Sequence, residues 1–257
     1  MSGTDHRKAE GWTGPAPVMV LVRPQLGENI GAAARAMWNF GLDRMRLVAP
    51  RDGWPNAKAV AMASGAGRVL DQVRVMDASA EACADLHFVF AATARRRDLT
   101  KEVLTPEQAM AQAHRMIAAG LRVGVLFGPE RAGLENDDIA RANAVISVPV
   151  NPAFASLNLA QCVLLTAYEW RRQSDTAGAA AAPAPKDRPA EIIEIEKLVE
   201  HLNGKLEAAS FFWPEHKRAS MTENLRNLFS RMPLTDADVR ILHGVIRALA
   251  DKTPAQK

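Results

Sequence analysis

The chain lacks the features that would place it in a membrane or in an oxidising compartment. No apolar run approaches the ~18 residues that a membrane span requires. Residues 1–14 are polar and have no apolar segment of the secretory type, so we expect a cytoplasmic protein. The two cysteines, Cys83 and Cys162, form no CxxC pair and indicate reduced, buried thiols. The six histidines are scattered, so no metal site is expected.

Several catalytic motifs are also missing. The first apolar run, residues 18–22, is followed by Arg23-Pro24-Gln25-Leu26-Gly27 rather than by the GxGxxG fingerprint of dinucleotide-binding sheets. No Walker A lysine, GxSxG serine or HExxH segment occurs. These absences argue against hydride transfer, phosphoryl transfer and serine hydrolysis.

Short apolar runs alternate with helical patterns along the first two thirds of the chain. Such runs are typical of strands that are buried on both faces. The alternation predicts an α/β fold with a mainly parallel sheet flanked by helices. The expected strands are 18–22, 45–49, 73–75, 86–92, 123–127 and 145–150. The expected helices of this part are 29–40 with Asn29 as its cap, one opened by Thr105 and Pro106, and one opened by Ser156 or Asn158.

Composition divides the chain into four parts. Residues 1–16 form a polar leader, 17–173 the α/β domain, 174–190 an Ala/Pro-rich linker, and 191–252 an all-helical C-terminal extension. The segments beyond residue 173 carry equal numbers of acidic and basic residues. The net charge of +3 therefore lies in the first 173 residues, which is compatible with a nucleic-acid partner without requiring one.

Three loops that follow predicted strands carry side chains able to do chemistry. Arg35 lies one turn into the first helix, where it could bind a phosphate or form a surface salt bridge. Glu130 and Arg131 follow a buried strand at the sheet edge that binds ligands, or they form a structural ion pair. Ser156 and Asn158 begin a helix, where such residues are most often caps.

A run of three arginines follows the strand that ends at residue 92. Arg95, Arg96 and Arg97 suit the phosphate backbone of RNA, because guanidinium groups bind phosphate through two parallel hydrogen bonds. Arg23, Arg35 and Arg131 complete the set of expected RNA contacts. The alternative for each arginine is a solvated or ion-paired surface position.

Taken together, the loops resemble the motifs of the SpoU branch of the SPOUT RNA methyltransferases. The motifs occur in order as Asn29-x-Gly31-x-x-x-Arg35, then Phe127-Gly128-Pro129-Glu130-x-x-Gly133-Leu134, then Pro149-x-Asn151 through Ser156-Leu157-Asn158-Leu159-Ala160. The chain departs from the family at Ala91-Ala92-Thr93-Ala94-Arg95, where Gly-Thr-Ser-Ala-Arg is common. Backbone contacts should survive that change.

The resemblance implies a SPOUT fold with a C-terminal trefoil knot, an S-adenosylmethionine cofactor, and a homodimer whose site draws on two chains. It also implies cofactor contacts, largely through the backbone, from Ala92, Thr93, Ala94, Gly128, Val148, Leu157 and Asn158. Arg35 is the implied catalytic residue, and the residues implied around it are Asn29, Glu130, Ser156 and Asn158.

Within the branch, the third motif and the helical tail resemble the enzymes that methylate a ribose 2′-oxygen in the anticodon loop of tRNA. The tail residues that carry this are Asn224-Leu225-Arg226-Asn227-Leu228-Phe229-Ser230-Arg231 and Ile241-Leu242-His243-Gly244-Val245. Two alternatives stay open. One is a SpoU-type enzyme for rRNA or another tRNA site, and the other is a non-catalytic RNA-binding protein on the same fold.

Overall fold

The fold was analysed in a computed structural model, which describes residues 12, 14–94, 101–174 and 187–250. The expected RNA contacts Arg95, Arg96 and Arg97 lie outside the described residues. So do most of the predicted leader and most of the predicted linker. No helix of the described part is long and apolar enough to cross a membrane.

A seven-stranded sheet with strand order β3-β2-β1-β6-β4-β7-β5 organises the first part of the chain, and every neighbouring pair is parallel. The central strands are almost entirely apolar and buried, as expected for a sheet covered on both faces. The strands are β1 (Val18–Val22), β2 (Met45–Val48), β3 (Arg74–Met76), β4 (Phe88–Ala92), β5 (Glu102–Leu104), β6 (Val123–Phe127) and β7 (Ala144–Ile146).

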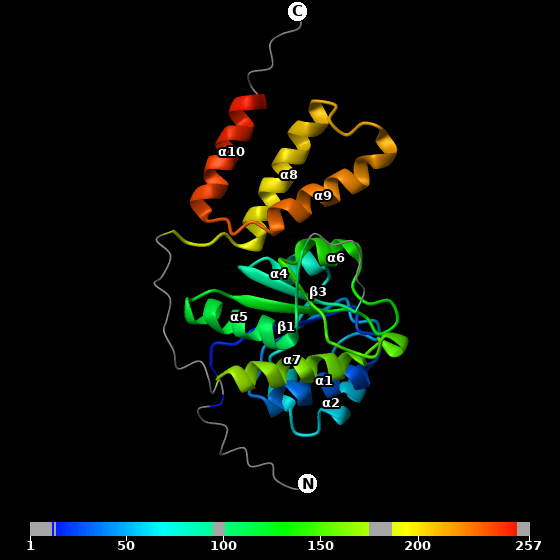
Figure 1. The fold of residues 1–257 in the computed structure, drawn as a ribbon. Helices are drawn as coiled ribbons and strands as arrows, with labels where there is room; N and C mark the ends of the chain where they lie inside the picture. Colours follow the sequence, from blue (N-terminus) through cyan, green and yellow to red (C-terminus); the bar gives the residue numbers. More distant parts are fainter. Residues whose placement is uncertain (1–11, 13, 95–100, 175–186, 251–257) are drawn as a thin grey trace, which may run out of the picture.

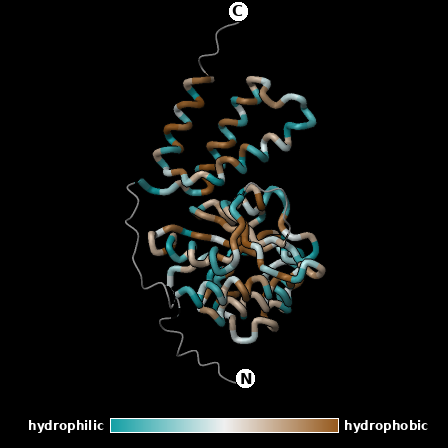
Figure 2. The backbone as a smooth tube through the Cα atoms, in the orientation of Figure 1, coloured by the Kyte–Doolittle hydropathy of each residue, from teal (hydrophilic) through white to brown (hydrophobic). Residues whose placement is uncertain are grey.

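Helices cover both faces of the sheet (Figure 1). One face packs against α1 (Gly27–Asn39), α5 (Pro106–Ala118) and α7 (Leu159–Ser174), with α2 (Ala57–Ala63) and α3 (Gly67–Asp71) against α1. The other face packs against α4 (Ser79–Cys83) and α6 (Asn136–Arg141). The hydrophobic residues are concentrated in the strands between these layers (Figure 2).

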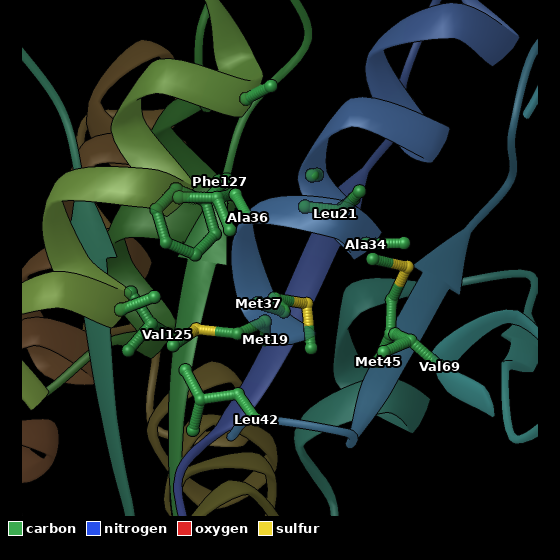
Figure 3. Packing of buried hydrophobic residues seen from close by; sticks show 14 of the residues in the cluster. Met19, Leu21, Ala34, Ala36, Met37, Leu42, Met45, Val69, Val125 and Phe127 are labelled. Atoms are coloured by element: carbon green, nitrogen blue, oxygen red, sulfur yellow. The ribbon is translucent and has the colours of Figure 1, made fainter. Parts of the chain in front are cut away.

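The larger core lies between the sheet and α1, where Met19, Met37 and Phe127 are fully buried or nearly so (Figure 3). Gly31 lets the backbone of α2 pack directly on α1, because a Cβ at Gly31 would lie 2.2 Å from the carbonyl oxygen of Ala59. The small residues of the first motif therefore accommodate a neighbouring helix.

The C-terminal extension forms its own small core above the α4–α6 face (Figures 1 and 2). Its elements are α8 (Ile192–Ala208), the 3-10 turn η3 (Glu215–Lys217), α9 (Arg218–Ser230) and α10 (Asp236–Ala250). The start of α8 is attached to the sheet domain, since the Ile192 amide donates to the Leu86 carbonyl at 2.8 Å. Ile192 itself belongs to the core cluster of the sheet domain.

The predicted α/β fold with a parallel sheet and a helical extension is confirmed, and several boundaries are not. Residues 18–22 and 123–127 are strands as predicted, and Thr105 caps its helix through a capping box with Gln108. The strand predicted at 145–150 ends at Ile146, and β5 was not predicted at all. The knot stays a prediction.

The prediction that Asn29 caps the first helix is wrong. The cap position is Leu26, which has no side-chain hydrogen bond to the helix, and Asn29 is buried within the first turn. Asn29 is therefore free to bond residues outside its own helix.

Candidate functional site

A cavity of about 350 Å³ opens where the central strands end. It is bounded by the last residues of three neighbouring strands, Ala92, Phe127 and Ile146, and by the loops that follow them. The carboxyl edge of a parallel sheet is where open α/β folds bind ligands. The volume is within the range of small-molecule sites.

Most residues predicted to hold a cofactor line this cavity, although they come from three separate loops. They are Ala92, Thr93, Ala94, Gly128, Val148 and Leu157. Asn158 is the exception: its neighbours Leu157 and Leu159 line the cavity, whereas its own side chain lies among the groups that hold the loops together. The cavity thus joins the second and third motif loops.

Glu130 accepts hydrogen bonds from the two residues that lead into α1 and from the side chain of Asn29 in its first turn. One carboxylate oxygen accepts from the Gln25 amide at 2.8 Å, and the other accepts from the Leu26 amide at 3.3 Å and from Asn29 Nδ2 at 2.6 Å. Free N–H groups and the helix dipole favour a carboxylate at this position. No ion pair joins Glu130 to Arg131, both of which the structure describes. Glu130 therefore holds the segment that enters α1, together with Asn29, against the second motif loop.

Asn29 and Asn158 extend this contact to the third motif. Asn158 Nδ2 donates to Asn29 Oδ1 at 3.0 Å, and Asn158 Oδ1 accepts from the Ala160 amide at 2.8 Å. Asn158 therefore caps α7 as predicted and also binds α1. A continuous chain of hydrogen bonds, Glu130–Asn29–Asn158, joins one residue from each motif beside the cavity.

The remaining expected catalytic residues lie at the surface. Ser156 is exposed and lines the cavity, as does Arg131. Arg35 is exposed on α1, does not line the cavity, and has no ion-pair partner among residues 12, 14–94, 101–174 and 187–250. Its guanidinium group is therefore available to a ligand that covers α1.

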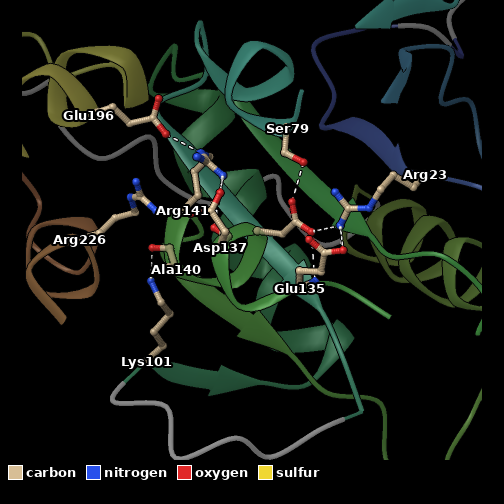
Figure 4. A network of polar contacts seen from close by, with 10 residues as sticks. Arg23, Ser79, Lys101, Glu135, Asp137, Ala140, Arg141, Glu196 and Arg226 are labelled. Atoms are coloured by element: carbon tan, nitrogen blue, oxygen red, sulfur yellow. Dashed lines mark hydrogen bonds and ion pairs between the residues drawn. The ribbon is translucent and has the colours of Figure 1, made fainter. Parts of the chain in front are cut away.

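Arg23, expected to contact RNA, is engaged within the fold. Its guanidinium binds Asp138 Oδ2 at 2.5 Å and lies 3.4 Å from Glu135 (Figure 4). Asp138 is buried and also accepts from Ser79 Oγ at 2.6 Å. A buried carboxylate needs such partners, so this ion pair accounts for Arg23 without RNA.

A second group of polar contacts holds the extension to the sheet domain, where Arg141 of α6 binds Glu196 of α8 and Arg226 of α9 binds Asp137 of α6 (Figure 4). The buried Nζ of Lys101 donates to the carbonyls of Ala140 and Ala142, and to Ser230 Oγ at 2.7 Å at the end of α9. Burial, together with the nearby Arg231, lowers the pKa of Lys101 to about 7. Sequence reasoning missed this lysine because its partners are backbone groups of distant segments.

Cys162 was also missed as a residue of the cavity wall. Cys162 lies four residues after Asn158, and its amide donates to the Asn158 carbonyl at 3.0 Å. Residues four apart on a helix share a face, so this spacing could have predicted that Cys162 lies near the third motif. Burial raises the pKa of its thiol to about 11. Among the described residues, no group of three or more His, Cys, Asp or Glu side chains could hold a metal ion.

Comparisons with known proteins bear on both parts of the chain. Residues 16–168 match the SpoU rRNA Methylase family, and residues 193–257 match the C-terminal domain of the tRNA methyltransferase TrmJ. The tRNA (cytidine/uridine/adenosine-2'-O-)-methyltransferase TrmJ of Pseudomonas aeruginosa is 34% identical over 236 residues. That alignment covers 89% of this chain and 91% of the relative.

Solved structures of similar proteins indicate the same family. The crystal structure of TrmJ from Z. mobilis ZM4 is 50% identical, with a TM-score of 0.82 over 91% of this chain and 99% of that one. A structure described as giving insights into the 2-OH methylation of C/U34 on tRNA is 27% identical, with a TM-score of 0.51 over 63% of this chain and 99% of that one. The chain therefore belongs to the SpoU methylase family and, within it, to the TrmJ group.

Proposed function

We propose that this protein is an S-adenosylmethionine-dependent methyltransferase that modifies a ribose 2′-oxygen in the anticodon loop of cytoplasmic tRNA. Family membership supports methyl transfer to RNA, and the match of the extension to the TrmJ C-terminal domain favours tRNA over rRNA. The relative whose structure concerns C/U34 on tRNA supports a cytidine or uridine at position 34 as the target nucleotide.

The cavity fits the cofactor chemically. S-adenosylmethionine would supply an electrophilic methyl group whose leaving group is a neutral thioether. The apolar side chains of Phe127, Ile146 and Leu157 suit the adenine ring and the methionine stem. The loop backbone around Ala94, Gly128 and Val148 carries N–H and C=O groups that can form hydrogen bonds with the polar groups of the cofactor.

The chain's own residues would align the ribose and assist loss of its proton. An arginine has a pKa above ~12 and is a poor general base at neutral pH, so we assign Arg35 to the phosphate next to the reacting ribose. Its positive charge there lowers the pKa of the 2′-hydroxyl and favours attack. Alignment alone contributes roughly 7–11 kcal/mol in the best intramolecular models.

We further propose that the enzyme is a homodimer with a knotted C-terminal sheet edge. Arg35 is exposed and does not line the cavity of its own chain. A second copy that covers α1 would bring its own cavity to this arginine. The exposed Phe154, Leu164 and Tyr168, on η2 (Pro152–Phe154) and α7, offer apolar surface for such a contact.

The observation that carries the proposal is the Glu130–Asn29–Asn158 chain, which assembles the three motif loops beside one cavity. The test is mass spectrometry of tRNA nucleosides from a strain without this gene. We expect loss of one anticodon-loop 2′-O-methyl nucleoside. An unchanged tRNA profile, with loss of an rRNA methyl group instead, would overturn the assignment to tRNA.

A further inference from the structure

A second cavity, of about 530 Å³, lies at the opposite edge of the sheet, where β1, β2, β3 and β6 begin. Val18 and Val123 on its wall are the first residues of β1 and β6, whereas Phe127, the last residue of β6, lines the cofactor cavity. A strand of five residues separates the two cavities by roughly 15 Å. The proposed reaction makes no use of this second cavity.

Four arginines and one aspartate are the ionisable residues of its wall. They are Arg44, Arg46, Arg74, Arg122 and Asp85. The arrangement follows from the sheet, because Arg46 and Arg74 are register partners on neighbouring strands and Arg44 lies two residues before Arg46. The Arg46 and Arg74 side chains therefore leave the same face of the sheet, and Arg44, immediately before β2, lines the same cavity.

Two of the four arginines form ion pairs or hydrogen bonds within the fold. Arg46 binds Asp85 through two hydrogen bonds of 2.5 and 2.9 Å, and this contact holds the pKa of that carboxyl below its usual range. Arg122 donates to the Asp85 carbonyl at 2.6 Å and to Glu191 at 2.8 Å. Both arginines are thus positioned by the fold, and the one acid is neutralised.

Arg44 and Arg74 make no such contacts with the residues that the structure describes. Both are exposed, and neither has an ion pair or a side-chain hydrogen bond within the described part of the chain. Two unpaired guanidinium groups lie over a wall whose apolar residues include Val18, Leu86 and Leu121. Apart from Asp85, Gln72 is the only side chain on this wall that could accept a hydrogen bond from a base edge.

We propose that this cavity binds the phosphate backbone of the tRNA, as a second contact remote from the reacting ribose. Guanidinium groups bind phosphate oxygens bidentately, and a wall of arginines holds RNA in place without reading its sequence. The assignment rests on tRNA being the substrate. It adds a binding surface at the edge of the sheet that faces away from the cofactor.

The test is the affinity for full-length tRNA, measured by fluorescence anisotropy at several salt concentrations, of the double variant Arg44→Ala/Arg74→Ala. Each phosphate contact contributes ~0.7–0.9 to the slope of log affinity against log salt, so the double variant should lose about 1.5 from that slope. We expect an affinity about tenfold lower, which corresponds to about 1.4 kcal/mol of binding free energy. Arg44→Lys/Arg74→Lys, which keeps both charges, should retain most of the slope.

Arg115→Ala is the matched control, because Arg115 is an exposed arginine on α5 that does not line the cavity. Thermal unfolding verifies that the double variant is folded. An affinity and a salt slope equal to those of the wild type would overturn the inference. The inference would also be overturned if the wild type bound UMP or inorganic phosphate, the double variant did not, and both bound tRNA with the same affinity. That result would make the cavity a small-ligand site.

Failure of the proposed function gives a different result. A wild-type protein that binds tRNA but transfers no methyl group to it would overturn the assigned reaction. Loss of tRNA affinity in the double variant alone would still support the second contact.

Discussion

Replacing Glu130 with alanine removes the acceptor that holds the three motif loops together. The carboxylate accepts from the Gln25 and Leu26 amides and from Asn29 Nδ2, at 2.8, 3.3 and 2.6 Å. In the variant, two backbone N–H groups and the amide of the buried Asn29 lose this partner. We therefore expect lower stability and a weaker cofactor site from a single change.

The magnitude follows from these contacts. Hydrogen bonds to a charged group contribute about 1.5–3 kcal/mol each, but Glu130 is partly exposed and water can replace the longest contact, so about 3 kcal/mol is expected in total. A favourable helix-dipole interaction of about 0.3–1 kcal/mol lies within that figure. At roughly 2–4 °C per kcal/mol for a chain of this size, the unfolding midpoint should fall by about 6–12 °C.

Urea unfolding of Glu130→Ala measures the loss directly, with Arg131→Ala as the control. Arg131 is exposed and lines the same cavity, so its replacement should change stability by no more than about 0.5 kcal/mol. A double-mutant cycle with Asn29→Ala should show strong non-additivity, because both variants break the same contact. A loss below about 1 kcal/mol for Glu130→Ala, or additive effects in the cycle, would refute the proposed role of Glu130 in joining the loops.

Three further predictions concern groups away from the cavity. In folded protein Lys101 has a pKa of about 7 against 10.5 for an ordinary lysine, so the unfolded chain binds more protons between those values and stability should rise with pH there. Urea unfolding of wild type and Lys101→Met should diverge above pH 7, and parallel curves would contradict the burial of this amine. Arg23→Ala removes the cation beside the buried Asp138, which keeps its hydrogen bonds from Ser79 and the Glu135 amide, and should cost about 1.5–3 kcal/mol in calorimetry. It should not weaken tRNA binding, and weaker tRNA binding by the folded variant would restore Arg23 as an RNA contact. Burial raises the pKa of the Cys83 thiol to about 12, so iodoacetamide at pH 8 should label Cys83 only after unfolding, and labelling of native protein would contradict that burial.

Hydrophobic pattern predicted the strands well where both faces are buried and less well at the edges of the sheet. β1 and β6 occur at the predicted residues because a continuous apolar run has few alternatives in the middle of a sheet. The run from Val145 continues past the end of β7, and its later residues line the cavity. An apolar pattern cannot distinguish a strand from an apolar loop. β5 has three residues at the sheet edge, two of them exposed, and gives no such pattern.

The motifs indicated which loops matter but not how they are joined. Asn158 has the sequence signature of a helix cap and is one. Asn29 has the same signature and is not a cap, because its side chain donates instead to Glu130, which lies 101 residues away in the sequence. Arg23 likewise depends on Asp138, 115 residues away. Such contacts depend on which strands are neighbours in the sheet, so the spacing of residues along the sequence cannot predict them.

Transfer of a labelled methyl group from S-adenosylmethionine to tRNA by the purified protein, followed by mapping of the modified nucleotide, tests the central claim most directly. Arg35→Lys keeps the charge but loses the bidentate guanidinium fork. We predict a 2′-O-methyl group on one anticodon-loop ribose with wild type, and loss of transfer with intact cofactor binding in Arg35→Lys. Wild-type protein that binds tRNA and cofactor but methylates no ribose, or Arg35→Lys that works at the wild-type rate, would contradict the account.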